Sequence, residues 1–199
     1  FDETAKQNII GYRSAASRAA ETLALSGQKA KAVEILDLAN REIPVSKYDD
    51  PRSLTSIVYG YIVSGQEQKA LKLADELKTS IFKEYDYYLS LPTKFQMYST
   101  RQMRQKPMEY ALLVNSISDA YIKIGQKDKG YDYTVKSIAT IDKRFDAFVK
   151  DMEEMGKEKA FNQIEKSQNI TNFYQYLFDV MHNYDTTYAT EKEAQVTRA

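Results

Sequence analysis

Paired carboxylates are the side chains of this sequence whose types and spacing come closest to a catalytic pattern. A glycosidase needs two carboxyl groups facing a sugar, one of them with a pKa raised by burial. Asp50 stands directly before Pro51, however, which is typical of a helix cap, and lysines surround Glu153 and Glu154, as on a solvated helix face. We therefore expect no catalysis at the three pairs: Asp49–Asp50, Glu153–Glu154, and Asp142 with Asp146.

His182 is the single histidine of the sequence, and it lies within an apolar helical pattern. A general base needs a nucleophile and a group that orients its ring, and one histidine cannot form a His-rich metal site. The sequence has no cysteine, no Gly-x-Ser-x-Gly motif, no Gly-rich phosphate loop and no EF-hand loop. We predict an ordinary, partly buried or surface histidine in a chain that is not an enzyme and needs no metal or other cofactor.

Charge and hydropathy exclude two further classes of protein. The 199 residues contain 28 Lys and Arg against 28 Asp and Glu, so the chain lacks the surplus positive charge with which proteins grip nucleic acid. No stretch reaches 18 consecutive apolar residues, so we expect that this chain does not span a membrane. We expect no nucleic-acid partner.

The segment 93–106 carries four cations and no acid, and we interpret it as a short basic helix inserted between repeats. Such a patch could contact acidic lipid headgroups, RNA or an acidic partner through a modest, salt-sensitive attraction. A solvated helix face is the ordinary explanation, because no longer basic run extends the segment. The cations of this basic patch are Lys94, Arg101, Arg104 and Lys106.

Tyrosine is unusually frequent, with 16 copies against eight phenylalanines. Its ring can be buried while its hydroxyl stays wet, which suits interfaces and sugar-facing surfaces as well as the seams between helices. Tyr61, Tyr88 and Tyr121 lie on apolar stripes, so we expect them in the core. Helical geometry aims Tyr59 away from the side of Tyr61.

Three near-identical phrases indicate an internal repeat of helical hairpins. Gly27-Gln28, Gly65-Gln66 and Gly125-Gln126 each follow one helical pattern and precede another. A glycine just past a helix end adopts the left-handed conformation that closes the helix. Apolar residues recur at three- and four-residue steps, and no alternating run of β-branched residues competes, so we predict an all-α fold.

The predicted domain covers residues 1–184. Pro107 opens a helix after the basic insert, and extra helices follow the last hairpin turn. From residue 185 to residue 199 the composition is polar and small, so we expect a frayed tail.

Three segments resemble the tetratricopeptide repeat: residues 13–46, 51–84 and 111–144. In the first, Ala16, Ala20, Leu23, Gly27 and Ala32 stand in successive consensus slots, and the third is degenerate in its second helix. The resemblance implies a right-handed superhelix of antiparallel helix pairs, in which neighbouring pairs share a core.

The same resemblance implies a concave groove that would hold a protein or peptide segment. Ser17 and Glu21 occupy the first positions of the carboxylate-clamp subclass without matching its Lys/Asn pattern, so binding of chaperone tails is not expected. The groove slots fall on Ser17, Arg18, Glu21, Arg52, Thr55, Ser56, Tyr59, Asn115, Ser116, Asp119 and Lys123.

About residues 1–155 also resemble the C-terminal region of Bacteroidetes multi-spanning membrane proteins of the domain-of-unknown-function 2723 family, whose membrane part is similar to protein O-mannosyltransferases. The resemblance implies that the chain, which begins with Phe rather than Met, is the soluble piece of a longer membrane protein on the periplasmic side of the inner membrane. It leaves two functions open: an interaction module, or an accessory domain that positions an acceptor protein or a glycan. The phrases that carry it are Asp2-Glu3-Thr4, Tyr12-Arg13, Lys31 to Asp37, Ile43-Pro44, Lys69-Ala70 and Tyr87 to Leu91.

Overall fold

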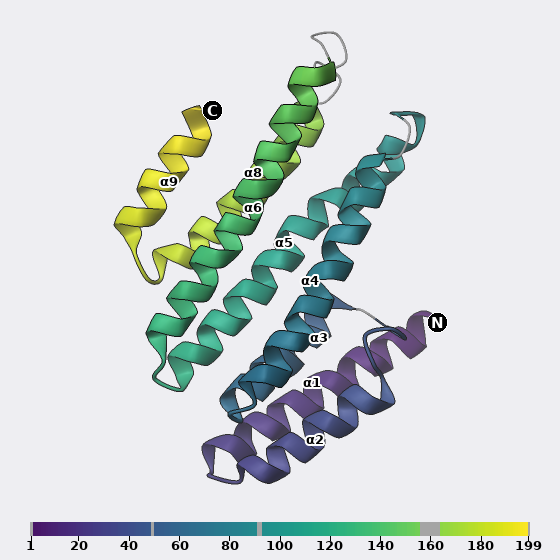
Figure 1. Cartoon of the computed structure of the whole chain (residues 1–199). Coiled ribbons are helices and arrows are strands. Elements are labelled where there is room, and N and C mark those ends of the chain that lie inside the picture. Colours follow the sequence, from purple (N-terminus) through teal and green to yellow (C-terminus); the bar gives the residue numbers. More distant parts are fainter. Residues whose placement is uncertain (1, 49, 91–92, 156–163, 199) are drawn as a thin grey trace. The chain divides into compact units, whose positions relative to one another are not determined.

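The computed structural model describes residues 2–48, 50–90, 93–155 and 164–198. Within these ranges the chain forms eight helices and no strand, which confirms the predicted all-α fold (Figure 1). The helices are α1 (Glu3–Leu25), α2 (Lys29–Glu42), α3 (Pro51–Val63), α4 (Glu67–Ser90), α5 (Thr93–Lys123), α6 (Lys127–Met155), α8 (Ile164–His182) and α9 (Thr186–Arg198).

The chain divides into two compact units, and each unit is assembled from two separate stretches of sequence. Phe1–Lys83 and Asn115–Gly130 make up the first unit, and Glu84–Val114 and Tyr131–Ala199 make up the second. The divisions fall inside α4, α5 and α6, so each of these helices contributes residues to both units.

The three Gly-Gln dipeptides form the same helix-closing turn, which confirms their predicted place between helices. Gly27, Gly65 and Gly125 have φ angles of 83°, 81° and 76°, in the left-handed region that favours glycine. The following glutamine N–H donates to a carbonyl five residues back in each case, and the glycine N–H donates to the carbonyl three residues before it. This is the Schellman arrangement, and it satisfies carbonyls that the helix end leaves open. The glutamine bonds are Gln28 to Leu23, Gln66 to Tyr61 and Gln126 to Tyr121, each at 2.8 Å.

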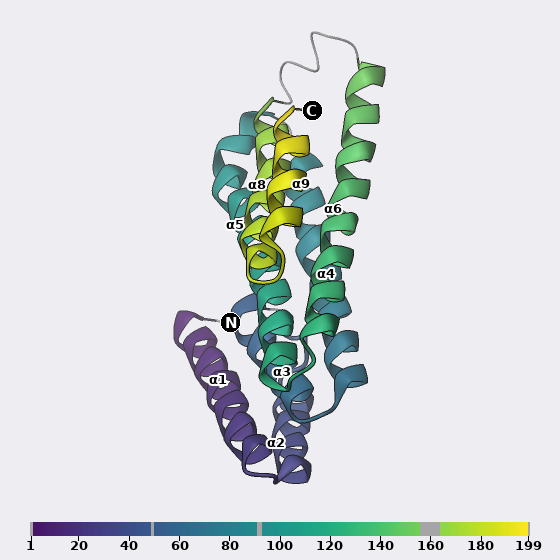
Figure 2. The same cartoon turned by 90° about the vertical axis from the view of Figure 1, so that its left-hand side faces the viewer.

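Helices α1, α2 and α3 pack side by side in the first unit (Figures 1 and 2). Ala20 on α1 and Ala32 on α2 are fully buried, and their small side chains let the two helices of the hairpin approach closely. A Cβ atom added at Gly60 on α3 would lie 3.0 Å from Cδ2 of Leu36 and 3.6 Å from Oγ of Ser17. The missing side chain at Gly60 therefore lets α3 lie against both α1 and α2.

The prediction of a separate basic helix over 93–106 is wrong, because α5 runs without a break from Thr93 to Lys123 with Pro107 inside it. An internal proline removes one helical hydrogen bond and costs about 3 kcal/mol in an unsupported helix. Tertiary packing offsets this cost here, since Lys106, Pro107 and Tyr110 are all buried.

The C-terminal segment also differs from the expected frayed tail, because residues 186–198 form α9. Asp185 caps this helix, with its carboxylate accepting the N–H of Tyr188 at 2.9 Å, and Ala189 is fully buried. Helix α9 folds back against α8 after a short turn (Figures 1 and 2). The polar composition did not reveal this helix, because Ala189 is the one buried residue between 186 and 192.

Candidate interaction site

Helices α1, α3 and α5 together line a polar hollow of about 330 Å³ within the first unit. We call it the polar hollow. Six of its seven lining residues belong to the predicted groove set, so the structure brings together side chains from all three predicted repeats. The lining residues are Ser14, Ser17, Arg18, Glu21, Ser56, Tyr59 and Ser116.

Serine hydroxyl groups join the three helices beneath the polar hollow. Ser17 on α1 donates to the carbonyl oxygen of Ser56 on α3 at 2.5 Å. Ser116 on α5 donates to the carbonyl oxygen of Thr55 at 3.1 Å. A short side chain that bonds to the backbone of a neighbouring helix holds the two helices close together. These serines therefore set the distances of α1 and α5 from α3 beneath the polar hollow.

Tyr59 stands between two carboxylates on the neighbouring helices. Its hydroxyl donates to Oε1 of Glu21 at 2.8 Å. Burial, the bond to Glu21 and the negative charges of Glu21 and Asp119 together raise the pKa of Tyr59 above its usual value, so the hydroxyl stays protonated. Burial also raises the pKa of Asp119, and a hydrogen bond from Asn115 at 2.9 Å opposes that rise.

Two arginines of the predicted groove set have exposed side chains, and one of them, Arg18, lines the polar hollow. Arg18 and Arg52 are both exposed. Within the described part of the chain, neither guanidinium takes part in a hydrogen bond or an ion pair.

Five residues of the predicted groove set are not among those that line the polar hollow: Arg52, Thr55, Asn115, Asp119 and Lys123. Thr55 is 3% exposed and donates to the carbonyl of Arg52, so its side chain is directed to its own helix. Asn115 and Asp119 bond to each other on α5, and Lys123 is exposed at the end of that helix. Ser14 was missed by sequence reasoning, although its position one turn before Arg18 on α1 would have indicated it.

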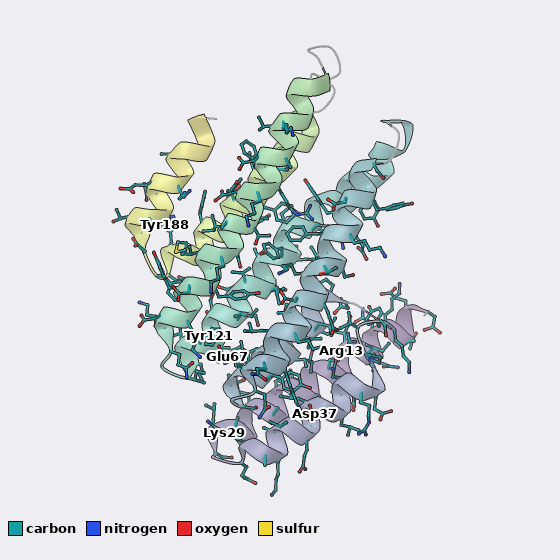
Figure 3. All side chains as sticks on the ribbon, viewed as in Figure 1. Arg13, Lys29, Asp37, Glu67, Tyr121 and Tyr188 are labelled. Carbon is teal, nitrogen blue, oxygen red and sulfur yellow. The ribbon has the colours of Figure 1, made fainter. Side chains whose placement is uncertain are left out.

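Arg13 is a second residue whose role the sequence did not reveal (Figure 3). It is 1% exposed, and its guanidinium donates to the carbonyl oxygens of Ile43 at 2.8 Å and Tyr48 at 2.7 Å, and to Oγ of Ser53 at 3.2 Å. The segment between α2 and α3 is therefore fastened to α1. This bond network fixes where α3 begins, and so where Ser56 and Tyr59 face the polar hollow.

Two tyrosine–carboxylate–lysine clusters link successive hairpins of the first unit. Tyr61 donates to Asp37 at 2.9 Å, and Lys69 forms an ion pair with the same carboxylate at 2.7 Å. A second, smaller hollow of about 220 Å³ opens beside this cluster and is also lined by Asn40, Lys72, Leu73 and Glu76.

The second cluster repeats the first with the lysine again eight residues after the tyrosine. Tyr121 donates to Glu67 at 2.7 Å and Lys129 pairs with Glu67 at 2.6 Å (Figure 3). The bonds from Lys129 and Tyr121 lower the pKa of Glu67, which stays ionised in the cluster. Tyr61 and Tyr121 are buried as predicted, whereas Tyr88 is only half-buried.

The structure changes the interpretation of the basic patch. Lys106 is 6% exposed and its ammonium pairs with Glu84 at 2.5 Å and Glu109 at 2.9 Å. It is therefore a buried structural cation, and no acidic partner can reach it. The side chains of Lys94, Arg101 and Arg104 lie outside the described residues.

Two of the carboxylates considered for catalysis accept hydrogen bonds that stabilise the fold. Asp50 caps α3 by accepting the N–H of Ser53 at 2.8 Å, and Asp142 accepts the hydroxyl of Tyr174 at 2.9 Å. His182 is exposed at the end of α8. The side chains of Asp49, Glu153 and Glu154 lie outside the described residues.

The described residues offer neither a metal site nor a helix that could span a membrane. No group of three His, Asp or Glu side chains is placed to hold a metal ion in these parts of the chain. None of the helices there is long and apolar enough to cross a membrane.

No protein-family model matches the chain, and no match was found among curated proteins or solved structures. The geometry and the charges of the polar hollow are therefore the basis for a functional conclusion.

Proposed function

We propose that this chain is a non-catalytic interaction module that holds a protein or peptide segment in the polar hollow. The observation that carries the proposal is the convergence of polar side chains from three helices, Arg18 and Glu21 among them, around one open volume of about 330 Å³. The serine bonds between the helices keep this surface formed without a ligand. Preorganisation of that kind reduces the entropy lost on binding.

The larger architecture belongs to the same proposal. Packing of α1 against both α2 and α3, together with the repeated glycine turns, supports stacking of helix pairs as a right-handed tetratricopeptide-like superhelix. We extend the proposal to cellular context on the resemblance alone: the chain would be part of a membrane protein, on the periplasmic side of the inner membrane.

Selection of peptides from a random displayed library tests the interaction module. The double variant Arg18→Glu, Arg52→Glu is expected to weaken the binding of selected peptides at least about tenfold, because both exposed guanidinium groups become carboxylates. Its melting temperature is expected to stay within a few degrees of the wild type, since exposed substitutions change stability by about 0.5 kcal/mol or less.

Lys31→Glu on α2 is the matched control, because it reverses an exposed charge away from the polar hollow. It should leave peptide binding unchanged. Peptides that bind equally well to the double variant and to the wild type would remove the polar hollow from consideration.

A second candidate function is an accessory domain that positions an acceptor protein or a glycan for a membrane glycosyltransferase. Exposed tyrosine rings favour it, since such rings stack on sugars: Tyr12, Tyr87 and Tyr176 are 41%, 60% and 37% exposed. Deletion of this region from the longer protein should then reduce glycosyl transfer to the acceptor. Full transfer after the deletion would contradict this function.

A further inference from the structure

Helices α1 and α3 run in parallel register along the polar hollow. Arg13 bonds to Ser53, Ser17 bonds to the backbone of Ser56, and Glu21 bonds to Tyr59, so residue numbers increase together on the two helices. A position along one helix therefore corresponds to a definite position along the other.

Helix α5 continues the same register on the other side of α3. Ser116 bonds to the backbone of Thr55, and Asp119 acts electrostatically on Tyr59. The hydrogen bonds thus show which positions of the three helices lie side by side. We call each set of such positions a row.

Charge is ordered along these rows. Arg18 precedes Glu21 by three residues on α1, and Arg52 precedes Tyr59, the partner of Glu21, by seven residues on α3. Glu21 and Asp119 both act on Tyr59, so the two acids lie further along the helices than the two arginines. The rise of 1.5 Å per helical residue puts the two groups of charges roughly 5 to 10 Å apart along the helices. The surface is thus basic at one end and acidic at the other.

The charged groups keep binding capacity. Tyr59 bonds to one oxygen of Glu21, and Asn115 bonds to one oxygen of Asp119. Among the described residues, the second oxygen of each carboxylate accepts no hydrogen bond. The exposed guanidinium groups of Arg18 and Arg52 likewise form no hydrogen bond with the residues that the structure describes. A partner that matched only one sign would leave the other group of charges unmatched.

We propose that the occupant of the polar hollow is an extended peptide segment with an acidic and a basic side chain two positions apart. This inference rests on the proposed function. In an extended chain such side chains point to the same face and lie about 6.6 Å apart, which matches the separation of the two groups of charges. The acid meets Arg18 and Arg52, and the base meets Glu21 and Asp119 over the ring of Tyr59, where a cation is also attracted by the aromatic face.

Four synthetic nonapeptides test the charge order on the whole chain. They share Gly/Ser flanks and differ in the central residues: Asp-Ala-Lys, Lys-Ala-Asp, Asp-Ala-Asp and Lys-Ala-Lys. Titration followed by amide chemical shifts of the protein gives both the affinity and the place of binding. At least one of the two mixed peptides is expected to bind about fivefold tighter than either like-charged peptide, with shifts on α1, α3 and α5 and a clear loss of affinity at high salt.

Two double variants separate the ends of the hollow. Glu21→Gln with Asp119→Asn should lower the affinity of the mixed peptide to that of Asp-Ala-Asp, and Arg18→Gln with Arg52→Gln should lower it to that of Lys-Ala-Lys. Lys31→Gln with Glu34→Gln on α2 is the matched control, because it removes an exposed cation and an exposed acid three residues apart, as Arg18 and Glu21 are. The control should change nothing.

The outcomes distinguish this inference from the function on which it rests. A like-charged peptide that binds as tightly as the mixed peptides overturns the charge order, while shifts on the hollow helices still support peptide binding. If none of the four peptides shifts the amide signals of these helices, the charge order is overturned as well. The library selection then decides separately whether the chain binds peptides. Shifts on the hollow helices from a neutral oligosaccharide, with none from the peptides, would overturn the inference in favour of a glycan.

Discussion

At the scale of single residues, the buried guanidinium of Arg13 governs how the first unit is put together. It donates to two backbone carbonyls in the segment before α3 and to Ser53 in the first turn of that helix. The centroid of the Tyr48 ring lies 5.7 Å from Cζ of Arg13. Leucine in its place could pack but could not donate, so the carbonyls of Ile43 and Tyr48 would lose this partner inside the protein.

Replacement of Arg13 by leucine is expected to lower the free energy of unfolding by about 2–4 kcal/mol. Arg18→Leu removes an arginine five residues later on the same helix, but from an exposed position, and should change that free energy by about 0.5 kcal/mol or less. Urea unfolding followed by circular dichroism measures both values. Equal stability of the two variants would show that the Arg13 bonds contribute nothing to the fold.

The sequence reveals only part of what single residues do. Asp50 next to Pro51 predicted a helix cap correctly, because the capping geometry is local. Lys106 was assigned to an exposed patch, because its partner Glu84 lies 22 residues earlier and nothing in the local pattern indicates the pairing. Distant polar partners of this kind are the least predictable features of the site.

At the scale of elements, the glycine turns determine where each helix ends. Their φ angles near +80° are strained for any residue with a Cβ atom, so the turn position is encoded by residue type. The same reasoning failed at Pro107, since a proline only disfavours a continuing helix and tertiary packing overrode that preference. It failed again at α9, because the cap at Asp185 and one buried residue, Ala189, gave a weak signal in a polar stretch.

Gly65→Ala is expected to destabilise the protein by about 1 kcal/mol, because alanine is strained at a φ of +81° even though a Cβ atom would meet nothing within 4 Å. Gly11→Ala is the matched control: Gly11 lies inside α1, also with nothing within 4 Å of an added Cβ atom. It should stabilise the protein by about 0.5–1 kcal/mol through helix propensity. Thermal unfolding compares the two, and a shift of the same sign in both would contradict the turn interpretation.

At the scale of the whole molecule, each compact unit draws on two distant stretches of sequence. The first unit needs residues 115–130, from which Ile117, Ala120 and Tyr121 are buried. The polar hollow needs the same stretch, because Ser116 lines it. Helix periodicity predicted the helices of this unit, but the sequence alone did not show where one unit ends and the other begins.

A fragment of residues 1–83 is therefore expected to unfold at a lower temperature and less cooperatively than a fragment of residues 1–130, which contains the whole first unit. The shorter fragment leaves the apolar surface that Ile117, Ala120 and Tyr121 cover open to water. Differential scanning calorimetry measures both transitions. A sharp transition at the same temperature in both fragments would show that residues 115–130 are dispensable for the unit.

The three Gly-Gln turns have a consequence for how such a chain can change in length. Each turn is closed by bonds among its own few residues, and the backbone angles at the three glycines agree within a few degrees. A gene rearrangement with its break at two of these dipeptides would thus join the helix before one turn to the helix after another. The turn between them would keep the same backbone conformation and hydrogen bonds. Whole hairpins could be gained or lost in this way without the invention of a new loop.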